Sequence, residues 1–546
     1  MTSLSRAFFA AIVKGLLRGK SLIGAILTYC VGPVTASKGK RKLSKTLPGF
    51  LKEVEAALLG STTSEGLQEL STELKKQFIE RLREDEQCML PSYSHQLPLG
   101  TELGHFVALD VGGSTLRVAL VALHGREVVV DEQSEIISMR TYRIDKDVKS
   151  LKGMAFFGWM AENISEALGE NGHYGKNAEK PLPVACAWSF PIEQTSMGGG
   201  KLLPMGKAFL ADQGLLGEDL GGIIKQACRD QNLHVELRAI VNDSSACLLS
   251  RAYSYPNTRF GLVLGTGVNL AAHLPVRSVG KQKFGVRPEN WFNEASHVII
   301  NTELGMFGHN ILPLTRWDQA LTKQHPRPDF QPLEHLVSGM YLGEVVRLVL
   351  LDAIAITGIF GGIVPPSLKG QYSLGTDTIS MIEGDKSPDL RGASQLFSER
   401  HPSYYRPTTS DLAAIKAISS FVSARSSALV ATCVYTLWDL RLDFERQYID
   451  SLSDMSAERK RIEAATTHLQ RTTVVAFNGS VIENYPGYLT SCQRYLNQLI
   501  QGGKGLLFEG DKELSEDPCI ELVPAKESSL LGAAVALACA ERANSC

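Results

Sequence analysis

The sequence has no C-x-x-C pair and no cysteine at metal-ligand spacing with a histidine, although it contains 10 cysteines. A disulfide framework or a structural zinc site usually shows such spacing. We therefore expect reduced thiols in an intracellular protein, most of them buried as small apolar side chains.

Two common nucleotide-binding signatures are also missing. There is no G-x-x-x-x-G-K-[ST] loop and no G-x-G-x-x-G turn, which excludes a P-loop or a Rossmann fingerprint. The formal net charge is only -2, so the overall charge does not indicate nucleic-acid binding. A chain of 546 residues is too long for one ordinary core, so we expect two domains or one large two-lobed fold.

Acidic residues are absent from the start of the chain, where the first one is Glu53. Apolar residues recur every four positions over 4–16 with basic residues among them, a pattern typical of an amphipathic helix on an anionic surface. A second apolar stretch, 21–36, is short for a membrane span and precedes the basic run KGKRK. Three interpretations remain: a peripheral membrane anchor, a mitochondrial targeting segment, or a tail that packs on its own domain.

Glycine turns between apolar runs recur three times, at LDVGGSTLRVALVAL (109–123), LGTGVNLAAHL and AFNGSVIENYPGY. A single such turn is usually a plain hairpin. Successive backbone N–H groups in a glycine turn also form an anion-binding nest. Three of them suggest a place where a nucleotide's phosphates are held between two lobes.

Helical spacing of apolar residues, in two runs, predicts helices between 48 and 85, and small residues in LLGAAVALACAERA predict a last helix that packs closely on a sheet. The segment 370–407 is rich in Ser, Asp, Gly and Pro, so we expect a loop there.

Several ordered motifs between about residue 50 and residue 541 resemble those of the hexokinase family. HFVALDVGGSTLRV is similar to the family's LALDLGGTNFRV, AWSFPIEQTSMGGGKLLPMGKAF to FSFP…QTS…WTKGF, and IVNDSSACLLSRAY to VNDTVGTLLSRAY. LGTGVNLA, INTELGMFG, LEHLVSGMYLGEVVRLVL and FNGSVIENYPGY have counterparts in FGTGCNAAY, INTEWGAFG, FEKMISGMYLGEIVRLVL and VDGSLYKKHPGF.

The resemblance implies an α/β fold of the actin-like, RNase H-like ATPase type, with sugar and ATP in a cleft between two lobes. It divides the chain into a basic tail (1–49), a small-lobe region (50–240) onto which a C-terminal helix (529–546) packs, and a large-lobe region (241–528). The implied activity is transfer of the γ-phosphoryl group of ATP to the 6-hydroxyl of an aldohexose, with Mg²⁺ as the cofactor of ATP.

The resemblance also implies a catalytic pair. Asp243, in VND, aligns with the family's catalytic base, and Lys207, in MGKAF, with a lysine that contacts the sugar and manages charge near the reacting oxygen. Taken alone, an Asp after a strand is explained equally well as the N-cap of the next helix. The residues that align with sugar-binding positions are Ser189, Phe190, Pro191, Asn242, Asn269, Glu303 and Glu334.

On the nucleotide side, Asp110 aligns with an acid that faces Mg-ATP, and a carboxylate there can hold Mg²⁺ through water because this ion keeps much of its hydration. Arg117 aligns with the phosphate-side arginine. The residues expected to bind the nucleotide are Asp110, Gly112, Gly113, Ser114, Thr115, Arg117, Gly265, Thr266, Gly267, Gly479 and Ser480.

This sequence departs from the family pattern near the sugar and near the adenine. Met205 and Gly206 stand where the family has Trp and Thr, and Ser528 and Leu530 replace two glycines of EDGSGVGAA. The first change removes a hydroxyl and opens space, which fits N-acetylglucosamine as well as glucose. The second fits a catalytically weak or inactive regulatory sugar-binding protein. Retention of the acid, base and phosphate positions favours activity. We expect a hexose substrate, a cytoplasmic location and contact of residues 1–45 with a membrane, above all the mitochondrial outer face.

Overall fold

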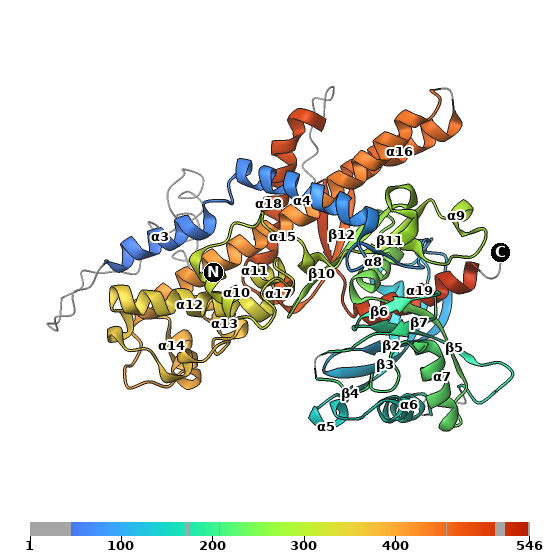
Figure 1. Cartoon of the computed structure of the whole chain (residues 1–546), viewed down its shortest axis with the longest axis horizontal. Helices are drawn as coiled ribbons and strands as arrows, with labels where there is room; N and C mark the ends of the chain where they lie inside the picture. Colours follow the sequence, from blue (N-terminus) through green and yellow to red (C-terminus); the bar gives the residue numbers. More distant parts are fainter. Residues whose placement is uncertain (1–44, 170–173, 207, 455, 508–518, 544–546) are drawn as a thin grey trace.

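The structure, a computed structural model, describes residues 45–169, 174–206, 208–454, 456–507 and 519–543. The predicted N-terminal amphipathic segment and Lys207 therefore lie outside the described residues. Within the described part, the chain folds around two main β-sheets with helices packed against them (Figure 1).

The smaller lobe is built on a five-stranded sheet. Its strands, in spatial order, are β4 (Ser134–Arg143), β3 (Thr115–His124), β2 (Leu103–Val111), β5 (Leu182–Trp188) and β8 (Val235–Val241). Strands β2, β5 and β8 are parallel, whereas β3 is antiparallel to both β2 and β4. A two-stranded sheet, β6 (Ile192–Gln194) with β7 (Gly200–Leu202), extends the connection after β5.

The larger lobe is built on a six-stranded sheet. Its strands, in spatial order, are β1 (Leu90–Pro91), β11 (His297–Asn301), β10 (Val268–Pro275), β9 (Thr258–Leu264), β12 (Thr473–Asn478) and β13 (Ile520–Pro524). Strands β9, β12 and β13 are parallel, and β10 is antiparallel to β9 and β11. Apart from β1, the order repeats that of the smaller sheet: an antiparallel three-stranded meander followed by two parallel strands.

Helices complete both lobes. Those of the smaller lobe are α5 (Lys146–Lys149), α6 (Met154–Gly169) and α7 (Leu220–Asp230). Those of the larger lobe are α3 (Leu47–Leu59), α4 (Ser64–Glu84), α9 (Trp291–Glu294), α10 (Arg316–Gln324), α11 (Glu334–Val337), α12 (Gly339–Thr357), α13 (Thr376–Gly384), α14 (Arg391–Arg400), α15 (Thr409–Ser451), α16 (Ala457–Arg471), α17 (Ser480–Asn484) and α18 (Tyr488–Leu507).

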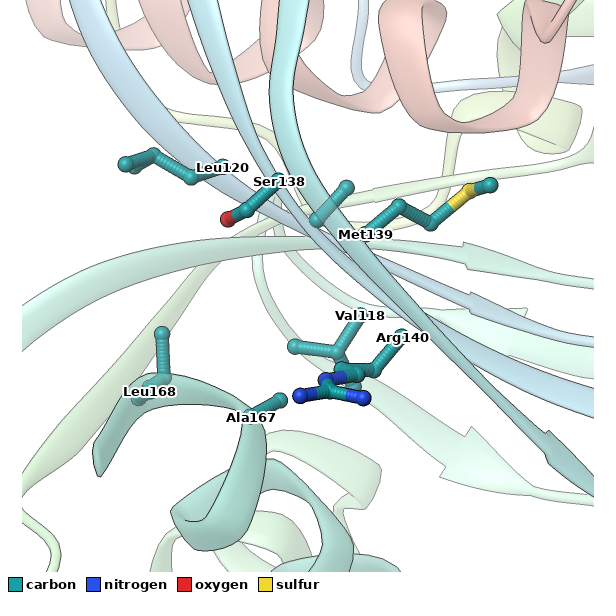
Figure 2. Close-up of a pocket in the computed structure, with 8 residues that line it drawn as sticks. Val118, Leu120, Ser138, Met139, Arg140, Ala167 and Leu168 are labelled. Atoms are coloured by element: carbon teal, nitrogen blue, oxygen red, sulfur yellow. The ribbon is translucent and has the colours of Figure 1, made fainter. Parts of the chain in front are cut away.

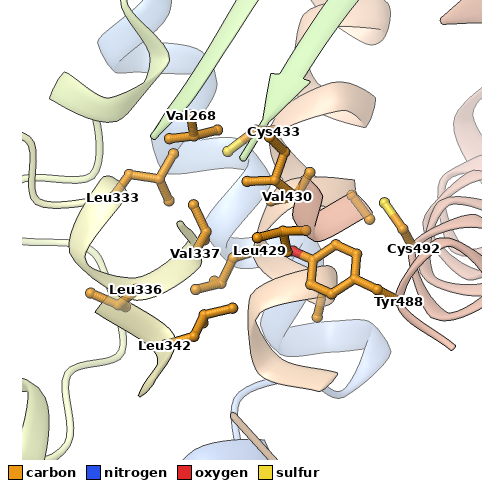
Figure 3. Packing of buried hydrophobic residues seen from close by; sticks show 14 of the residues in the cluster. Val268, Leu333, Leu336, Val337, Leu342, Leu429, Val430, Cys433, Tyr488 and Cys492 are labelled. Atoms are coloured by element: carbon orange, nitrogen blue, oxygen red, sulfur yellow. The ribbon is translucent and has the colours of Figure 1, made fainter. Parts of the chain in front are cut away.

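Helix α15 is the central support of the larger lobe. Its 43 residues are buried on most sides, and it packs against α3, α4, α12 and α18. In Figure 3, Leu429, Val430 and Cys433 of this helix lie among side chains from α11, α12, β10 and α18. Among the described helices, α15 alone is long and apolar enough to cross a membrane, but 89% of its most apolar window is buried inside the protein. The burial identifies it as a core helix.

The two predicted N-terminal helices are confirmed as α3 and α4, but their place corrects the predicted lobe boundary. Thr63 caps α4, and the buried apolar residues of both helices belong to the same core as the larger sheet. The core of the smaller lobe, in contrast, contains residues from Val107 to Ile240. The range 50–240 is therefore too long at its start, because the first two helices pack on α15.

The segment 370–407, expected as a loop, contains two helices, α13 and α14. Polar residues cover their exposed sides, while Ile379 and Ile382 of α13 and Phe397 of α14 are buried in the large-lobe core. The prediction was wrong because it was based on the average composition of the segment and not on its few apolar residues with helical spacing.

Two helices join the lobes: α8 (Asp243–Ser254) and α19 (Ser528–Ala543). They pack on each other and share a core with the inner faces of both sheets, as Figure 1 also indicates. Gly532 makes the crossing close, since a Cβ atom there would lie 2.0 Å from the carbonyl oxygen of Ala246. The predicted C-terminal helix thus contacts strands β2, β5 and β8 of the smaller lobe, and helix α8 belongs to both lobes.

Candidate active site

The carboxyl ends of three parallel strands bring the first group of predicted residues together. Asp110 lies near the end of β2, Ser189 directly follows β5, and Asp243 follows β8 after one intervening residue. The three strands pair in parallel, and the N–H of Ser189 donates to the carbonyl of Val111 at 3.2 Å. The hydroxyl of Ser189 donates to Oδ1 of Asp243 at 2.8 Å.

Asn242, not Asp243, caps helix α8. Oδ1 of Asn242 accepts from the N–H of Ser244 at 3.0 Å and from its hydroxyl at 2.8 Å. This overturns the interpretation of Asp243 as a helix cap. The carboxylate of Asp243 is therefore not used to satisfy the helix end, and the amide NH₂ of Asn242 is the half of that side chain not engaged by the cap.

A second group lies on the larger sheet, where β10 begins and β11 ends. The Nδ2 amide of Asn269 donates to Oδ1 of Asn301 at 2.9 Å, and the amide of Asn301 donates to Oε1 of Glu303 at 2.7 Å. Burial raises the pKa of Glu303, while the hydrogen bonds from the two amides oppose that shift. Glu303 also has a left-handed backbone (φ 52°), which is unusual for a residue with a side chain.

Glu334, at the start of α11, fixes the second glycine turn beside this group. Its Oε2 accepts from the N–H of Val268 at 2.9 Å. The carbonyl of Gly265 accepts from the N–H of Gly339 at 2.8 Å, and that of Thr266 from Met340 at 3.1 Å, so the first turn of α12 also holds the turn. The amides and carboxylates of Asn269, Asn301, Glu303 and Glu334 make a dense set of acceptors and donors suited to a polyol.

Asn301 is a member of this group that the sequence reasoning missed. It precedes Glu303 by two residues in INTE and bridges it to Asn269. An amide and an acid two residues apart at a strand end were the available signal.

The first glycine turn has the form expected of an anion nest. The N–H of Gly112 closes the turn on the carbonyl of Thr115 at 3.0 Å. Within the described residues, the N–H groups of Gly113 and Ser114 have no backbone acceptor, and Ser114 is exposed. Both N–H groups are therefore available to an anion.

Asp110 and Arg117 face each other across the same hairpin. Asp110 is 7% exposed, and its Oδ2 accepts from Nε of Arg117 at 2.8 Å and also from Nη2. Burial raises the pKa of Asp110, an effect that the Arg117 charge opposes. Nη1 of Arg117 donates to Oε2 of Glu527 at 2.5 Å, in the loop after β13. This bond joins the first turn to the strand ends of the other sheet.

The second and third glycine turns are in contact. A Cβ atom on Gly479 would lie 2.4 Å from the carbonyl oxygen of Leu264, and Gly479 has a φ of 125°. Its N–H donates to Oε1 of Glu483 at 3.1 Å, a reach-back typical of a helix start. The hydroxyl-bearing Thr266 and Ser480 are both exposed beside this contact.

Met205 and Gly206, the two residues that depart from the family pattern before Lys207, lie in different environments, which the sequence did not indicate. Met205 is buried in the small-lobe core, and its N–H donates to Asp212 at 3.0 Å, so its thioether is not a flexible pocket lining. Gly206 has a φ of 65° and open space around its missing Cβ. Phe190 packs on Phe209 with ring centroids 4.9 Å apart, and Pro191 is exposed.

A separate cavity of about 250 Å³ lies between β3, β4 and α6 (Figure 2). None of its lining residues is a predicted site residue. Figure 2 shows the guanidinium of Arg140 beside Ala167 near the C-terminal end of α6, where a cation is favourable. In the described residues no group of His, Cys, Asp and Glu side chains is arranged to hold a metal ion by itself.

Comparison with known proteins places the chain in a family. Two hexokinase family models match consecutive parts of it, residues 52–253 and 259–539. Hexokinase-7 of Oryza sativa subsp. japonica is 30% identical over 451 residues, which cover 82% of this chain and 87% of that protein. The chain belongs to the hexokinase family. It is a sugar kinase, a phosphotransferase that acts on hexoses.

Two further hexokinases agree with this assignment. The hexokinase of Kluyveromyces lactis is 29% identical over 453 residues, covering 83% of each chain. A solved hexokinase from Schistosoma mansoni, complexed with glucose, superposes with a TM-score of 0.70 at 24% identity and covers 91% of this chain and 100% of its own. The actin-like, two-lobed α/β fold expected from the sequence is thus confirmed.

Proposed function

We propose that this hexokinase transfers the γ-phosphoryl group of ATP to the 6-hydroxyl of an aldohexose, with Asp243 as the general base. The observation that best supports this role is that the helix cap and the candidate base are two different residues at the start of α8. Asn242 caps the helix, and the carboxylate of Asp243 bonds instead to the hydroxyl of Ser189. A carboxylate so placed can accept the proton of a sugar hydroxyl as phosphoryl transfer proceeds.

The amide–carboxylate group on the larger sheet would orient the sugar. Asn269, Glu303 and Glu334 would accept and donate hydrogen bonds to its hydroxyls, and Asn301 would hold the first two in place. The amide NH₂ of Asn242 would add a donor from the opposite lobe. Fixing one hydroxyl beside the base lowers the entropic part of the barrier.

The nucleotide would lie along the glycine turns. The free N–H groups of Gly113 and Ser114 and the guanidinium of Arg117 suit phosphate oxygens. The residues fit Mg²⁺ held through water, since Arg117 bonds to Oδ2 of Asp110 and leaves Oδ1 for a hydrated ion. When bound, Mg²⁺ would neutralise charge on the phosphate oxygens.

For the sugar itself, we propose that N-acetylglucosamine is accepted alongside glucose. The support is the open space around Gly206 next to Lys207. Because Gly206 has a left-handed backbone, a β-branched Thr would be strained there, so Gly206→Asn is the better test of added bulk. It should lower kcat/KM for N-acetylglucosamine more than for glucose. An unchanged ratio, or a wild type that phosphorylates glucose alone, contradicts this specificity.

The alternative, a catalytically inactive regulator, rested on the altered adenine loop. Leu530 lies in the first turn of α19, not in a loop, and is fully buried in the core shared by α8 and α19, which gives the substitution a packing role. A coupled ADP-release assay with ATP, Mg²⁺ and a panel of hexoses tests the proposed function. ADP release that depends on a hexose and disappears in Asp243→Asn supports the kinase, whereas sugar binding without ADP release supports the regulator.

We also propose that residues 1–45 tether a cytoplasmic enzyme to the mitochondrial outer membrane. The support is the acid-free, basic and apolar pattern of that segment. Deleting it should release the protein from the membrane fraction and leave kcat unchanged, because every predicted site residue lies downstream. A membrane distribution that survives the deletion rules out this tether.

A further inference from the structure

The guanidinium on the phosphate side of the site is already occupied by the chain's own carboxylates. Arg117 donates through Nε and Nη2 to Asp110 and through Nη1 to Glu527, the last at 2.5 Å. These bonds engage three of the five N–H donors of the guanidinium, so a phosphate group that takes the Nη1 donor facing Glu527 must replace that acid.

The two carboxylates differ in how readily they can leave. Asp110 is the cross-strand neighbour of Arg117 in the β2–β3 hairpin, and it is buried. Its removal would leave an uncompensated buried charge. This acid is therefore a permanent partner that holds the arginine in place.

Glu527 comes from the opposite side of the site. It lies 410 residues further along the chain, after β13 of the larger sheet, and its side chain is 44% exposed. Among the described residues its carboxylate has no hydrogen-bond partner other than Arg117. An exposed ion pair is weak and its acid is readily rehydrated. Of the two acids, Glu527 is the one that an incoming anion can displace.

From this geometry we propose that Glu527 is an internal competitor of the nucleotide: it occupies Nη1 of Arg117 in the nucleotide-free enzyme and is displaced by a phosphate group of ATP. This inference rests on the proposed nucleotide role of Arg117. The consequence is an affinity for ATP lower than the turns and Arg117 would give by themselves.

The test is Glu527→Gln, which keeps the size of the side chain and removes its charge. Titration calorimetry with Mg-ATP and steady-state kinetics should show that Kd and KM for ATP fall about two- to five-fold, the value of an exposed ion pair. The value of kcat and the KM for the hexose should stay unchanged. An unchanged or higher Kd for ATP would overturn the proposal, and a higher one would make Glu527 a ligand of Mg²⁺ or of the nucleotide.

Two controls test whether the gain in ATP affinity comes from the ion pair with Arg117 or from removing any negative charge near the site. Glu483→Gln removes an acid beside the third turn. This acid bonds to the N–H of Gly479 and not to Arg117. An equal gain in ATP affinity in this variant contradicts the specific pairing. In an Arg117→Lys background, the planar fork that reaches Glu527 is gone, so adding Glu527→Gln should have no further effect. If that double variant still gains affinity, the pairing is not the cause.

Failure of the proposed function gives a different result. A wild type that neither binds Mg-ATP nor releases ADP with any hexose overturns the kinase and this inference together. A wild type that does both, with a Glu527→Gln variant of identical affinity, overturns the inference alone.

Discussion

Replacing Asp243 by Asn separates the catalytic role of this residue from any structural one. The amide is nearly the same size, and its oxygen can still accept from the hydroxyl of Ser189, now 2.8 Å from Oδ1. The helix cap is unaffected because it belongs to Asn242. The cost in stability should therefore stay within the value of one hydrogen bond, roughly 0.5–1.5 kcal/mol.

The effect on the rate should be much larger. An amide does not take up the proton of the sugar hydroxyl, and loss of a general base lowers a rate by about 10²–10⁴-fold. This corresponds to roughly 2.7–5.5 kcal/mol in the barrier. The KM for the hexose should change little, since the sugar is held mainly by Asn269, Glu303 and Glu334.

Three measurements on purified protein check this prediction: kcat by coupled ADP release, Tm by calorimetry and hexose affinity by titration. Ser189→Ala is the matched control, because it removes the hydrogen bond and keeps the carboxylate; it should lower kcat by no more than about ten-fold. If Asp243→Asn kept kcat within ten-fold of wild type, Asp243 would not be the base. A collapse of Tm in the variant would show that the carboxylate has a structural role.

Four further predictions concern the packing of α19, two buried carboxylates and closure of the lobes. Gly532→Ala should destabilise the protein by roughly 1–3 kcal/mol or more, visible as a lower Tm, because its Cβ would meet the carbonyl of Ala246 at 2.0 Å. Burial raises the pKa of Glu303 above 4.5, so the KM for the hexose should rise as the pH falls towards that raised value, and Glu303→Gln should abolish this dependence. Glu383 lies in α13, and its Oε2 accepts from the hydroxyl of Tyr485 at 2.8 Å. Burial raises its pKa from 4.5 to about 7, so the folded protein keeps a proton that the unfolded protein loses above pH 4.5. Stability should therefore fall as the pH rises from 4.5 to 7. Glu383→Gln should remove that loss, measured as the difference in Tm between pH 5 and pH 8; an unchanged difference would contradict it. Saturating hexose should compact the enzyme in small-angle scattering, because the acceptor must be shielded from water; no change with a bound hexose would argue against closure.

The strand ends and the glycine turns could be predicted from sequence because their signals are local. Two apolar runs joined by two glycines predict the hairpin, and the structure adds that Asp110 and Arg117 are cross-strand neighbours in it. The place of Asp243 after a strand could be predicted too, but not which residue caps α8, since Asn242 and Asp243 are both good caps. Only the side-chain geometry distinguishes them.

Long-range pairings had no such signal. Arg117 and Glu527 are 410 residues apart in the chain, and their bond forms only because the fold brings two sheets together. The packing of α3 and α4 on α15 depends on a core that the small-lobe strands do not share. Sequence patterns report which face of an element is apolar, but they do not report which other apolar face will cover it.

The repeated sheet topology explains why all three glycine turns follow parallel strands. In each sheet the parallel strands have their carboxyl ends at the same edge. The glycine turns and polar residues that follow these strands therefore lie together at that edge. Helices α8 and α19 hold the two sheets together through small residues at Ala246 and Gly532. Because the two helices approach each other so closely at these residues, sliding one helix along the other would cause a steric clash. The bond between Arg117 and Glu527 lies close to this joint, because Glu527 directly precedes α19.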